Sequence, residues 1–239
     1  MTGIASMLES VRQRITEAAA RAGRDPRDVE IVAVTKTVGP EAIREAVRAG
    51  ISIIGENRVQ EASRKFAVLG ARVDGKPVAW HLIGHLQTNK VKAALEIFSL
   101  IHSLDSWRLA CEIERVAERL DKVVECLVEI NVSGIPSRFG VDPDAAVALA
   151  RQVAALDRLR LAGVMAIAPV VETKEDARPY FRMAREICGR IQDEGLFKAG
   201  KVCLSMGMTQ DFEVAVEEGA TIVRIGTGIF GPRRGEAML

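Results

Sequence analysis

The stretch Ile31-Val32-Ala33-Val34-Thr35-Lys36-Thr37, with the segment 40–49 that follows it, decides the fold. Its apolar half is rich in β-branched residues, which predicts a short strand buried on both faces of a parallel sheet. Pro40 suits the first turn of a helix, where its missing N–H costs nothing, and Gly50 suits the position beyond the helix end. The stretch is therefore one strand–helix unit.

The same unit recurs along the chain. Strands are predicted at residues 31–34, 51–54, 78–83, 97–102, 123–130, 161–165, 201–204 and 221–225. Amphipathic helices are predicted between them, among others at 40–49, 106–120, 142–156, 174–194 and 210–218. We expect Asp142 and Thr209 to cap two of these helices. A flexible loop is expected at 70–77, where Gly, Asp and Pro cluster.

Strict alternation of strand and helix means parallel pairing, with the helices outside the sheet. Eight such units in 239 residues lie close to the roughly 250 residues of a (β/α)8 barrel. The sequence therefore predicts an α/β fold, a single (β/α)8 TIM barrel domain over residues 1–239. The residues before Ile31 are expected to form an extra N-terminal helix.

Composition and charge argue against several classes of protein. A formal net charge of +1 and an aromatic content of 4% predict no nucleic acid partner. No apolar run approaches the ~20 residues of a membrane span, and the charged N-terminal segment does not resemble a signal peptide. The four cysteines and three histidines lack metal-ligand spacing, so we expect a reduced, cytoplasmic protein without a metal site.

Lys36 is the first candidate for chemistry because it stands where the first predicted strand ends. Active sites of barrels form at the C-terminal ends of the strands. An amine at this rim can lose its solvent, which lowers its pKa and makes it a nucleophile that forms a Schiff base with a carbonyl group. Taken alone, an ordinary surface lysine is the commoner explanation.

A phosphate site is predicted after the last two strands, where barrels often bind phosphate. Ser205 offers a hydroxyl group there, and Gly226, Thr227 and Gly228 let backbone N–H groups approach an anion. Ordinary glycine-containing turns are the alternative. A lysine and a phosphate cradle on one face suit a ligand that carries an aldehyde and a phosphate. Pyridoxal 5'-phosphate (PLP) and the substrate of a phosphosugar aldolase both meet this description.

Arg224 interrupts the apolar run of the last predicted strand. A charge inside a barrel strand is costly unless it is paired, so a salt bridge at the barrel rim is one explanation. In a PLP site, an arginine that faces the pyridine nitrogen would keep that nitrogen unprotonated. The ring would then be a poor electron sink, which limits carbanion chemistry.

The chain resembles the pyridoxal-phosphate homeostasis protein family in six segments: AVTKT at 33–37, IGENRVQE at 54–61, WHLIGHLQTNK at 80–90, IHSLDS at 101–106, LSMGMTQDFEVAVEEGAT at 204–221 and VRIGTGIFGPR at 223–233. The resemblance implies a barrel related to the N-terminal domain of alanine racemase. It also implies a set of PLP contacts: a Schiff base on Lys36, phosphate contacts from Ser205 and from the backbone of Gly226 and Thr227, Arg224 at the ring nitrogen, and Asn57 nearby.

His81 and Met165 are further candidates for lining the PLP pocket, although core packing also explains Met165. The chain departs from the family in two places. Arg58 stands where the family often has an aromatic residue, and Arg138 stands in the turn 133–140 where the family commonly has a lysine. Arginine cannot form a Schiff base, so any role for an amine in that turn does not carry over.

The resemblance implies a protein of intracellular vitamin B6 homeostasis that holds PLP and hands it on, with apo-forms of PLP enzymes as recipients. The alternative is a PLP-dependent, racemase-like enzyme, which needs a second proton carrier opposite the lysine. Alanine racemases take that group from a tyrosine of a second domain. Here Tyr180 is the one tyrosine and lies in a predicted outer helix, so His81 or His85 would have to serve. Since no second domain is predicted, we expect a monomer without turnover of its own.

Overall fold

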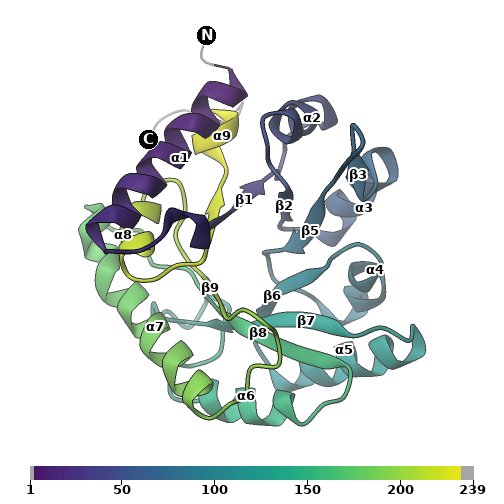
Figure 1. The fold of residues 1–239 in the computed structure, drawn as a ribbon. Coiled ribbons are helices and arrows are strands. Elements are labelled where there is room, and N and C mark those ends of the chain that lie inside the picture. Colours follow the sequence, from purple (N-terminus) through teal and green to yellow (C-terminus); the bar gives the residue numbers. More distant parts are fainter. Residues whose placement is uncertain (1–2, 233–239) are drawn as a thin grey trace.

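The computed structural model describes residues 3–232. Eight parallel strands close into a barrel in the order β1-β10-β9-β8-β7-β6-β5-β2, with helices around it (Figure 1). The barrel that strand–helix alternation predicts is therefore confirmed. Its strands are β1 (Glu30–Val34), β2 (Ile53–Glu56), β5 (Ala79–Leu82), β6 (Leu100–Leu104), β7 (Val124–Ile130), β8 (Leu159–Ala166), β9 (Cys203–Ser205) and β10 (Ile222–Ile225).

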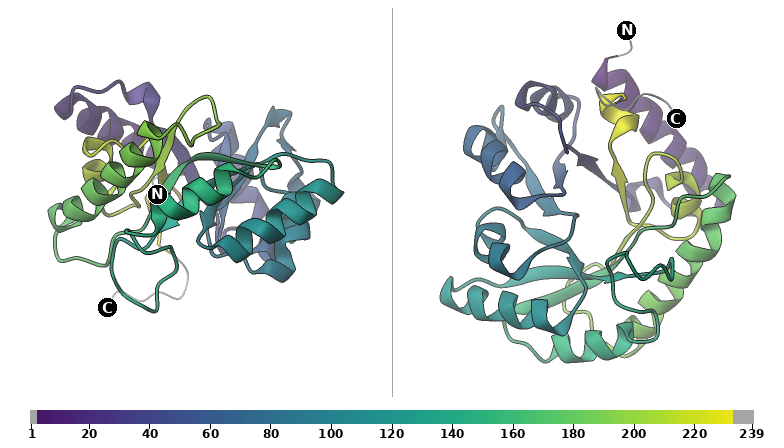
Figure 2. Two further views of the ribbon diagram at one scale, coloured as in Figure 1. Left: turned by 90° about the horizontal axis from the view of Figure 1, so that it is seen from below. Right: turned by 180° about the vertical axis from the view of Figure 1, so that it is seen from behind.

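The helices form an outer layer that both views of Figure 2 show wrapped around the strands. They are α1 (Ile4–Arg21), α2 (Pro40–Arg48), α3 (Val59–Leu69), α4 (Val91–Leu95), α5 (Trp107–Arg119), α6 (Ala146–Ala154), α7 (Arg178–Asp193), α8 (Phe212–Glu217) and α9 (Thr227–Phe230), with 3₁₀ turns η1 (Pro26–Asp28), η2 (Thr88–Lys90) and η3 (Lys174–Ala177). The expected N-terminal helix is α1. It contacts α8 and α9, so the outer layer is continuous where the chain begins and ends (Figure 1).

Two hydrophobic cores hold the layers together. The larger one lies between the helices and the outer face of the barrel, and α1 contributes Leu8, Val11 and Ile15 to it. The smaller one fills the barrel interior with side chains of several strands, among them Val32 and Met165. This interior plug leaves the carboxyl ends of the strands as the open face.

Gly163 lets β8 and β9 approach each other. Its φ is 151°, and a Cβ atom there would stand 1.8 Å from the carbonyl oxygen of Cys203. The register between β7 and β8 also shifts between Cys126 and Leu127. Only glycine fits this position, because any side chain would overlap the backbone of β9.

Three local predictions were wrong. The expected loop at 70–77 contains a hairpin of β3 (Arg72–Val73) and β4 (Lys76–Pro77), because Asp74 and Gly75 both adopt positive φ, as such a two-residue turn requires. Helix α6 begins at Ala146, and the Asp142 carboxylate accepts the N–H of Asp144 in the turn before it. Thr209 does not cap α8. Its hydroxyl accepts the N–H of Gly228 instead.

Candidate functional site

The carboxyl ends of the strands surround a pocket of about 850 Å³, called the Lys36 pocket below. Lys36 is half-buried and reaches it from the end of β1. Asn57 lines it after β2, His85 after β5, Glu129 from β7 and Ile167 after β8. The structure therefore brings Lys36 and Asn57 together, as the sequence predicts.

The backbone on both sides of Lys36 is held by helix α3. The ammonium group of Lys65 donates to the Thr35 carbonyl at 2.5 Å, and the Thr37 N–H donates to the Glu61 carboxylate at 2.7 Å. Thr37 has a φ of 64°, a strained value for a β-branched residue that surrounding contacts must maintain. These two contacts fix the path of the chain through Lys36, and hence where its side chain starts.

A buried ion pair supports this arrangement. Lys65 donates to Glu56 at 2.6 Å and to Glu61 at 2.7 Å, and the Thr35 hydroxyl donates to Glu56 at 2.5 Å. Glu56 is fully buried, and burial raises its pKa, although the bonds from Lys65 and Thr35 act in the opposite direction. Sequence analysis missed both Lys65 and Glu56. Glu56 was missed because the predicted strand ended at Ile54, whereas β2 extends to Glu56. The spacing of Glu61 and Lys65, four residues apart, is the one available signal.

The side chain of Asn57 has a buried oxygen, Oδ1, without a hydrogen-bond partner in the described residues 3–232. A buried amide without a partner is unusual in a native fold, and such groups commonly contact a ligand or an ordered water. The side chain therefore fits the predicted position beside a polar ligand.

Arg224 lies inside the barrel, with 3% of its surface exposed. One guanidinium nitrogen donates to the Ser205 hydroxyl at 2.6 Å, and another donates to the Ala166 carbonyl at 2.9 Å. Burial lowers the pKa of Arg224 to about 10, and the charges of Glu129 and Asp211 oppose this shift. Hydrogen bonds thus hold the arginine from two strands, which is the condition for a buried guanidinium to keep one orientation.

Ser205 continues this network away from the open face. Its hydroxyl lies 3.0 Å from His102 Nδ1, and His102 Nε2 lies 3.1 Å from His81 Nδ1. Burial lowers the pKa of both imidazoles, that of His81 to about 4, so both rings are neutral at pH 7. Since Arg224 only donates, the three contacts are mutually consistent when Ser205 donates to His102 and His102 donates to His81.

The predicted phosphate residues are thus divided between two places. Ser205 is fully buried within the Arg224 network, and its contact with a phosphate stays a prediction. Gly226 lies next to β1, where a Cβ atom on it would stand 3.5 Å from Val34 Cβ. The following N–H, that of Thr227, has no hydrogen-bond partner among residues 3–232, whereas the N–H of Gly228 donates to Thr209.

The two histidine candidates also separate. His81 lines a hollow with Glu30 and Glu125, residues near the amino ends of β1 and β7. His85 lines the Lys36 pocket, lies 3.1 Å from an Asp105 carboxylate oxygen, and stacks on Phe139 with ring centroids 3.8 Å apart. Met165, the other tentative pocket residue, is fully buried in the interior core.

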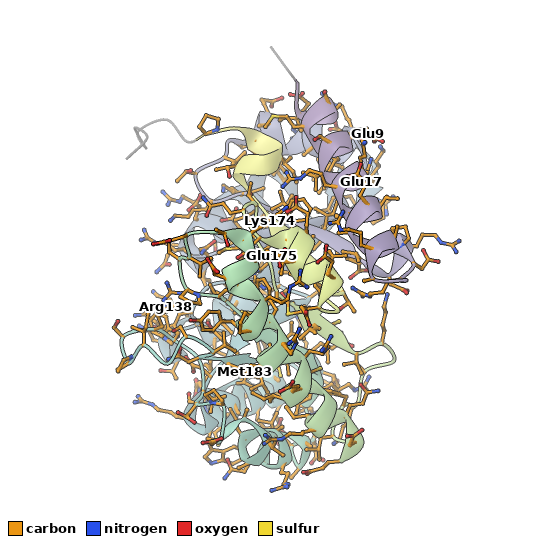
Figure 3. The ribbon with its side chains drawn as sticks, turned by 90° about the vertical axis from the view of Figure 1, so that its left-hand side faces the viewer. Glu9, Glu17, Arg138, Lys174, Glu175 and Met183 are labelled. Carbon is orange, nitrogen blue, oxygen red and sulfur yellow. The ribbon has the colours of Figure 1, made fainter. Side chains whose placement is uncertain are left out.

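Arg138 has a structural contact of its own. It donates to the Ala168 carbonyl at 3.2 Å and thereby ties the loop after β7 to the end of β8. Figure 3 labels Arg138 on this loop, which stands out from the outer helix α7 that carries Met183. The departure from the family in this turn therefore replaces an amine with a group that anchors the loop.

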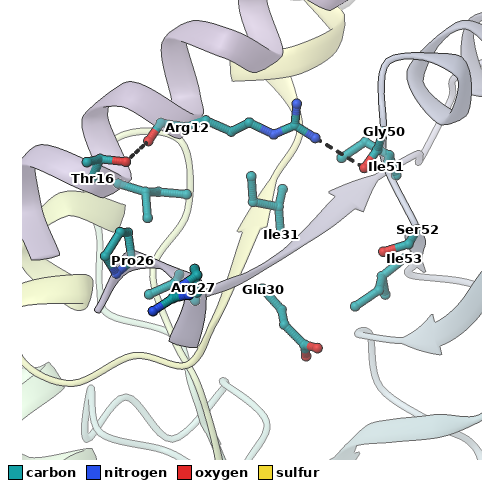
Figure 4. Close-up of a pocket in the computed structure, with 12 residues that line it drawn as sticks. Arg12, Thr16, Pro26, Arg27, Glu30, Ile31, Gly50, Ile51, Ser52 and Ile53 are labelled. Carbon is teal, nitrogen blue, oxygen red and sulfur yellow. Dashed lines mark hydrogen bonds between the residues drawn. The ribbon is translucent and has the colours of Figure 1, made fainter. Parts of the chain in front are cut away.

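A further hollow lies beside α1 (Figure 4). Arg12 donates across it to the Gly50 carbonyl at 3.2 Å, and the Thr16 hydroxyl donates to the Arg12 carbonyl at 3.0 Å. The first bond joins α1 to Gly50, just after α2, and the second lies within α1. None of the candidate site residues lines this hollow, so it is not the candidate site.

Comparison with known proteins agrees with this geometry. The family described as alanine racemase, N-terminal domain, matches residues 7–234. The pyridoxal phosphate homeostasis protein of Aquifex aeolicus is 44% identical over 95% of this chain and 97% of its own length. That of Escherichia coli K12 is 40% identical over 98% of each chain. The chain belongs to the pyridoxal phosphate homeostasis protein family.

Solved structures place this family member among similar barrels. PipY of Synechococcus elongatus PCC7942, solved with PLP bound, is 37% identical and superposes with a TM-score of 0.82 over 95% of this chain and 100% of its own. Alanine racemase of Clostridium difficile is 14% identical and matches with a TM-score of 0.72, over 94% of this chain and 56% of its own. The second likeness concerns the fold alone.

Two further features describe this family member between residues 3 and 232. None of its helices combines the length and the apolar character needed to cross a membrane. In the same range, no three His, Cys, Asp or Glu side chains gather closely enough to hold a metal ion.

Proposed function

We propose that this protein binds PLP covalently through Lys36 and acts in cytoplasmic vitamin B6 homeostasis, without catalytic turnover of its own. The observation that carries the proposal is the Lys36 pocket, in which a half-buried lysine is held by backbone contacts on both sides. Relatives that share about 40% of the sequence bear the name pyridoxal phosphate homeostasis protein, and the PipY structure contains PLP.

The chain's own residues fit such a cofactor. When bound, PLP supplies an aldehyde that condenses with an amine and a ring that withdraws electrons. Lys36 offers the amine, and Asn57 offers a buried acceptor that has no partner among residues 3–232. Arg224 is held in one orientation inside the barrel, and the Thr227 N–H is free to donate to an anion. Gly226 allows close approach of that backbone, and Ser205 would act on the phosphate or through Arg224.

The proposal includes the expected setting of the protein. We propose one PLP-binding domain over residues 1–239, which works as a monomer in the cytoplasm and passes PLP to apo-forms of PLP enzymes. The open mouth of the Lys36 pocket supports such release, because Arg58 and Gln60 at its rim are exposed to solvent. A racemase-like activity is the alternative that the test must separate.

The absorption spectrum of the purified protein tests the proposal. Reconstitution with PLP should give a visible band that borohydride abolishes, with the added mass on Lys36. Lys36→Ala should lose the band, and Lys90→Ala, a matched change in the same pocket, should keep it. A wild type that stays colourless with PLP would refute the proposal. Turnover of any amino acid in a racemase panel, lost in Lys36→Ala, would favour the enzyme instead.

A further inference from the structure

Glu129 faces Lys36 across the pocket. Going round the barrel from β1, strand β7 is reached after four steps in either direction, so the two strands are diametrically opposed. Both side chains line the same pocket. Sequence analysis did not select Glu129, because it stands inside an apolar strand far from Lys36 in the chain.

The Glu129 carboxylate lacks the partner that burial demands. The residue is 6% exposed, and its Oε2 is buried with no hydrogen-bond partner in residues 3–232. Burial and, to a lesser extent, the charge of Asp105 raise its pKa to about 7, against the opposing charge of Arg224. The other titratable groups that line the pocket are Lys36, Arg58, Glu61, Arg64, His85 and Lys90, and Met165, the β8 neighbour of Glu129, is uncharged. A free carboxylate beside a pocket at this pKa is suited to accept a proton near pH 7.

Space for a second molecule adjoins Glu129. A hollow of about 270 Å³ shares Glu129, Phe139 and Ile167 with the Lys36 pocket and continues beneath the loop after β7. Its walls include the apolar side chain of Ile130. A small molecule whose amine lies at Glu129 would therefore find room for its substituent beside the pocket, without displacing a ligand on Lys36.

We propose that Glu129 is the general base that lets a primary amine take PLP from Lys36. This inference rests on the proposed function and explains how a protein that binds PLP covalently can release it. An incoming R–NH3⁺ gives one proton to Glu129 and, as R–NH2, attacks the former aldehyde carbon of PLP, which is doubly bonded to the Lys36 nitrogen. A C–N bond to the incoming nitrogen forms, and the C–N bond to Lys36 breaks. The proton held by Glu129 and the two protons left on the attacking nitrogen pass to the Lys36 nitrogen, which leaves as an ammonium group, and Glu129 is again ionised.

The test follows release of PLP from the loaded protein. Alanine or ethylamine is added between pH 6 and 8, the protein is separated from small molecules at timed intervals, and the PLP that remains on it is measured by its visible band. Glu129→Gln, compared with wild type at equal PLP occupancy, should release PLP roughly 100-fold more slowly, the lower end of general base catalysis. The ratio of wild-type to variant rates should rise with pH and level off above 7. Glu125→Gln, an exposed change on the same strand, should behave as wild type.

A second measurement needs no cofactor. The carboxyl carbon of Glu129, followed by NMR in the cofactor-free protein, should titrate with a midpoint near 7. A midpoint near 4.5, or release rates within twofold of wild type in loaded Glu129→Gln, would overturn the inference while the proposed function stands. A wild type that never acquires the band overturns the proposed function, and the inference with it.

Discussion

Replacing Lys65 by methionine should markedly lower the free energy of unfolding of the protein. The ammonium group makes three bonds, to Glu56, Glu61 and the Thr35 carbonyl, and its side chain is 9% exposed. Methionine keeps the length and removes the charge, which leaves a fully buried Glu56 carboxylate without its cation. Breaking a buried pair in this way costs about 3–5 kcal/mol. In a chain of this size, each kcal/mol lowers Tm by roughly 2–4 °C, so we expect a fall of about 10 °C or more.

Urea unfolding of Lys65→Met beside Lys92→Met, an exposed lysine of α4, measures this cost. Adding Glu56→Gln to Lys65→Met should recover at least ~1 kcal/mol, because no uncompensated charge then remains. PLP retention on Lys36 should fall in Lys65→Met more than in the control. The reasoning would be refuted if the unfolding free energy of Lys65→Met lay within 0.5 kcal/mol of that of Lys92→Met, since a difference of about 3 kcal/mol is expected. It would also be refuted if the double variant were no more stable than Lys65→Met.

Three further predictions concern the barrel. Gly163→Ala should lower the free energy of unfolding in urea by more than ~4 kcal/mol, because its Cβ would overlap a β9 carbonyl. The control Gly189→Ala in α7, where a Cβ meets nothing within 4 Å, should raise it by ~0.5–1 kcal/mol, and equal effects would contradict this. The pKa of Glu129 is raised from 4.5 to about 7, so the stabilisation present below pH 4.5 is lost as the pH rises through 7. Over this range the wild type should lose roughly 3 kcal/mol of unfolding free energy that Glu129→Gln keeps. Parallel pH profiles of the two proteins would contradict this prediction. Ser205→Ala should weaken PLP retention by about 1–3 kcal/mol in equilibrium dialysis, since Arg224 loses an acceptor; unchanged retention would show that the hydroxyl serves neither role.

The order of elements was predictable because each strand and helix is encoded by neighbouring residues. Apolar runs and helical periodicity placed all eight strands, with ends that differ by up to three residues. Those small differences matter at Glu56. If the strand ended at Ile54, Glu56 would lie in a loop. In the structure β2 continues to Glu56, and its side chain is fully buried.

The site was predictable only in part. Lys36 lies just beyond β1, so the rule that barrel sites form at strand ends selects it as a candidate, whereas Asn57 was selected from the family resemblance. Lys65 and Glu129 carry no such signal, because a lysine on a helix and an acid within a strand have many ordinary explanations. Their roles depend on burial and on partners that other strands bring to them.

The sequence by itself determined the barrel, the lysine at the end of its first strand and the family, since local patterns and motifs encode these. The tertiary structure alone decided that Glu129 stands opposite Lys36 and that Ser205 holds Arg224. Closing the sheet brings together strands that are far apart in the chain. It also removes water from the acids, the arginine and the histidines inside, and the pKa of each group depends on that loss of solvent.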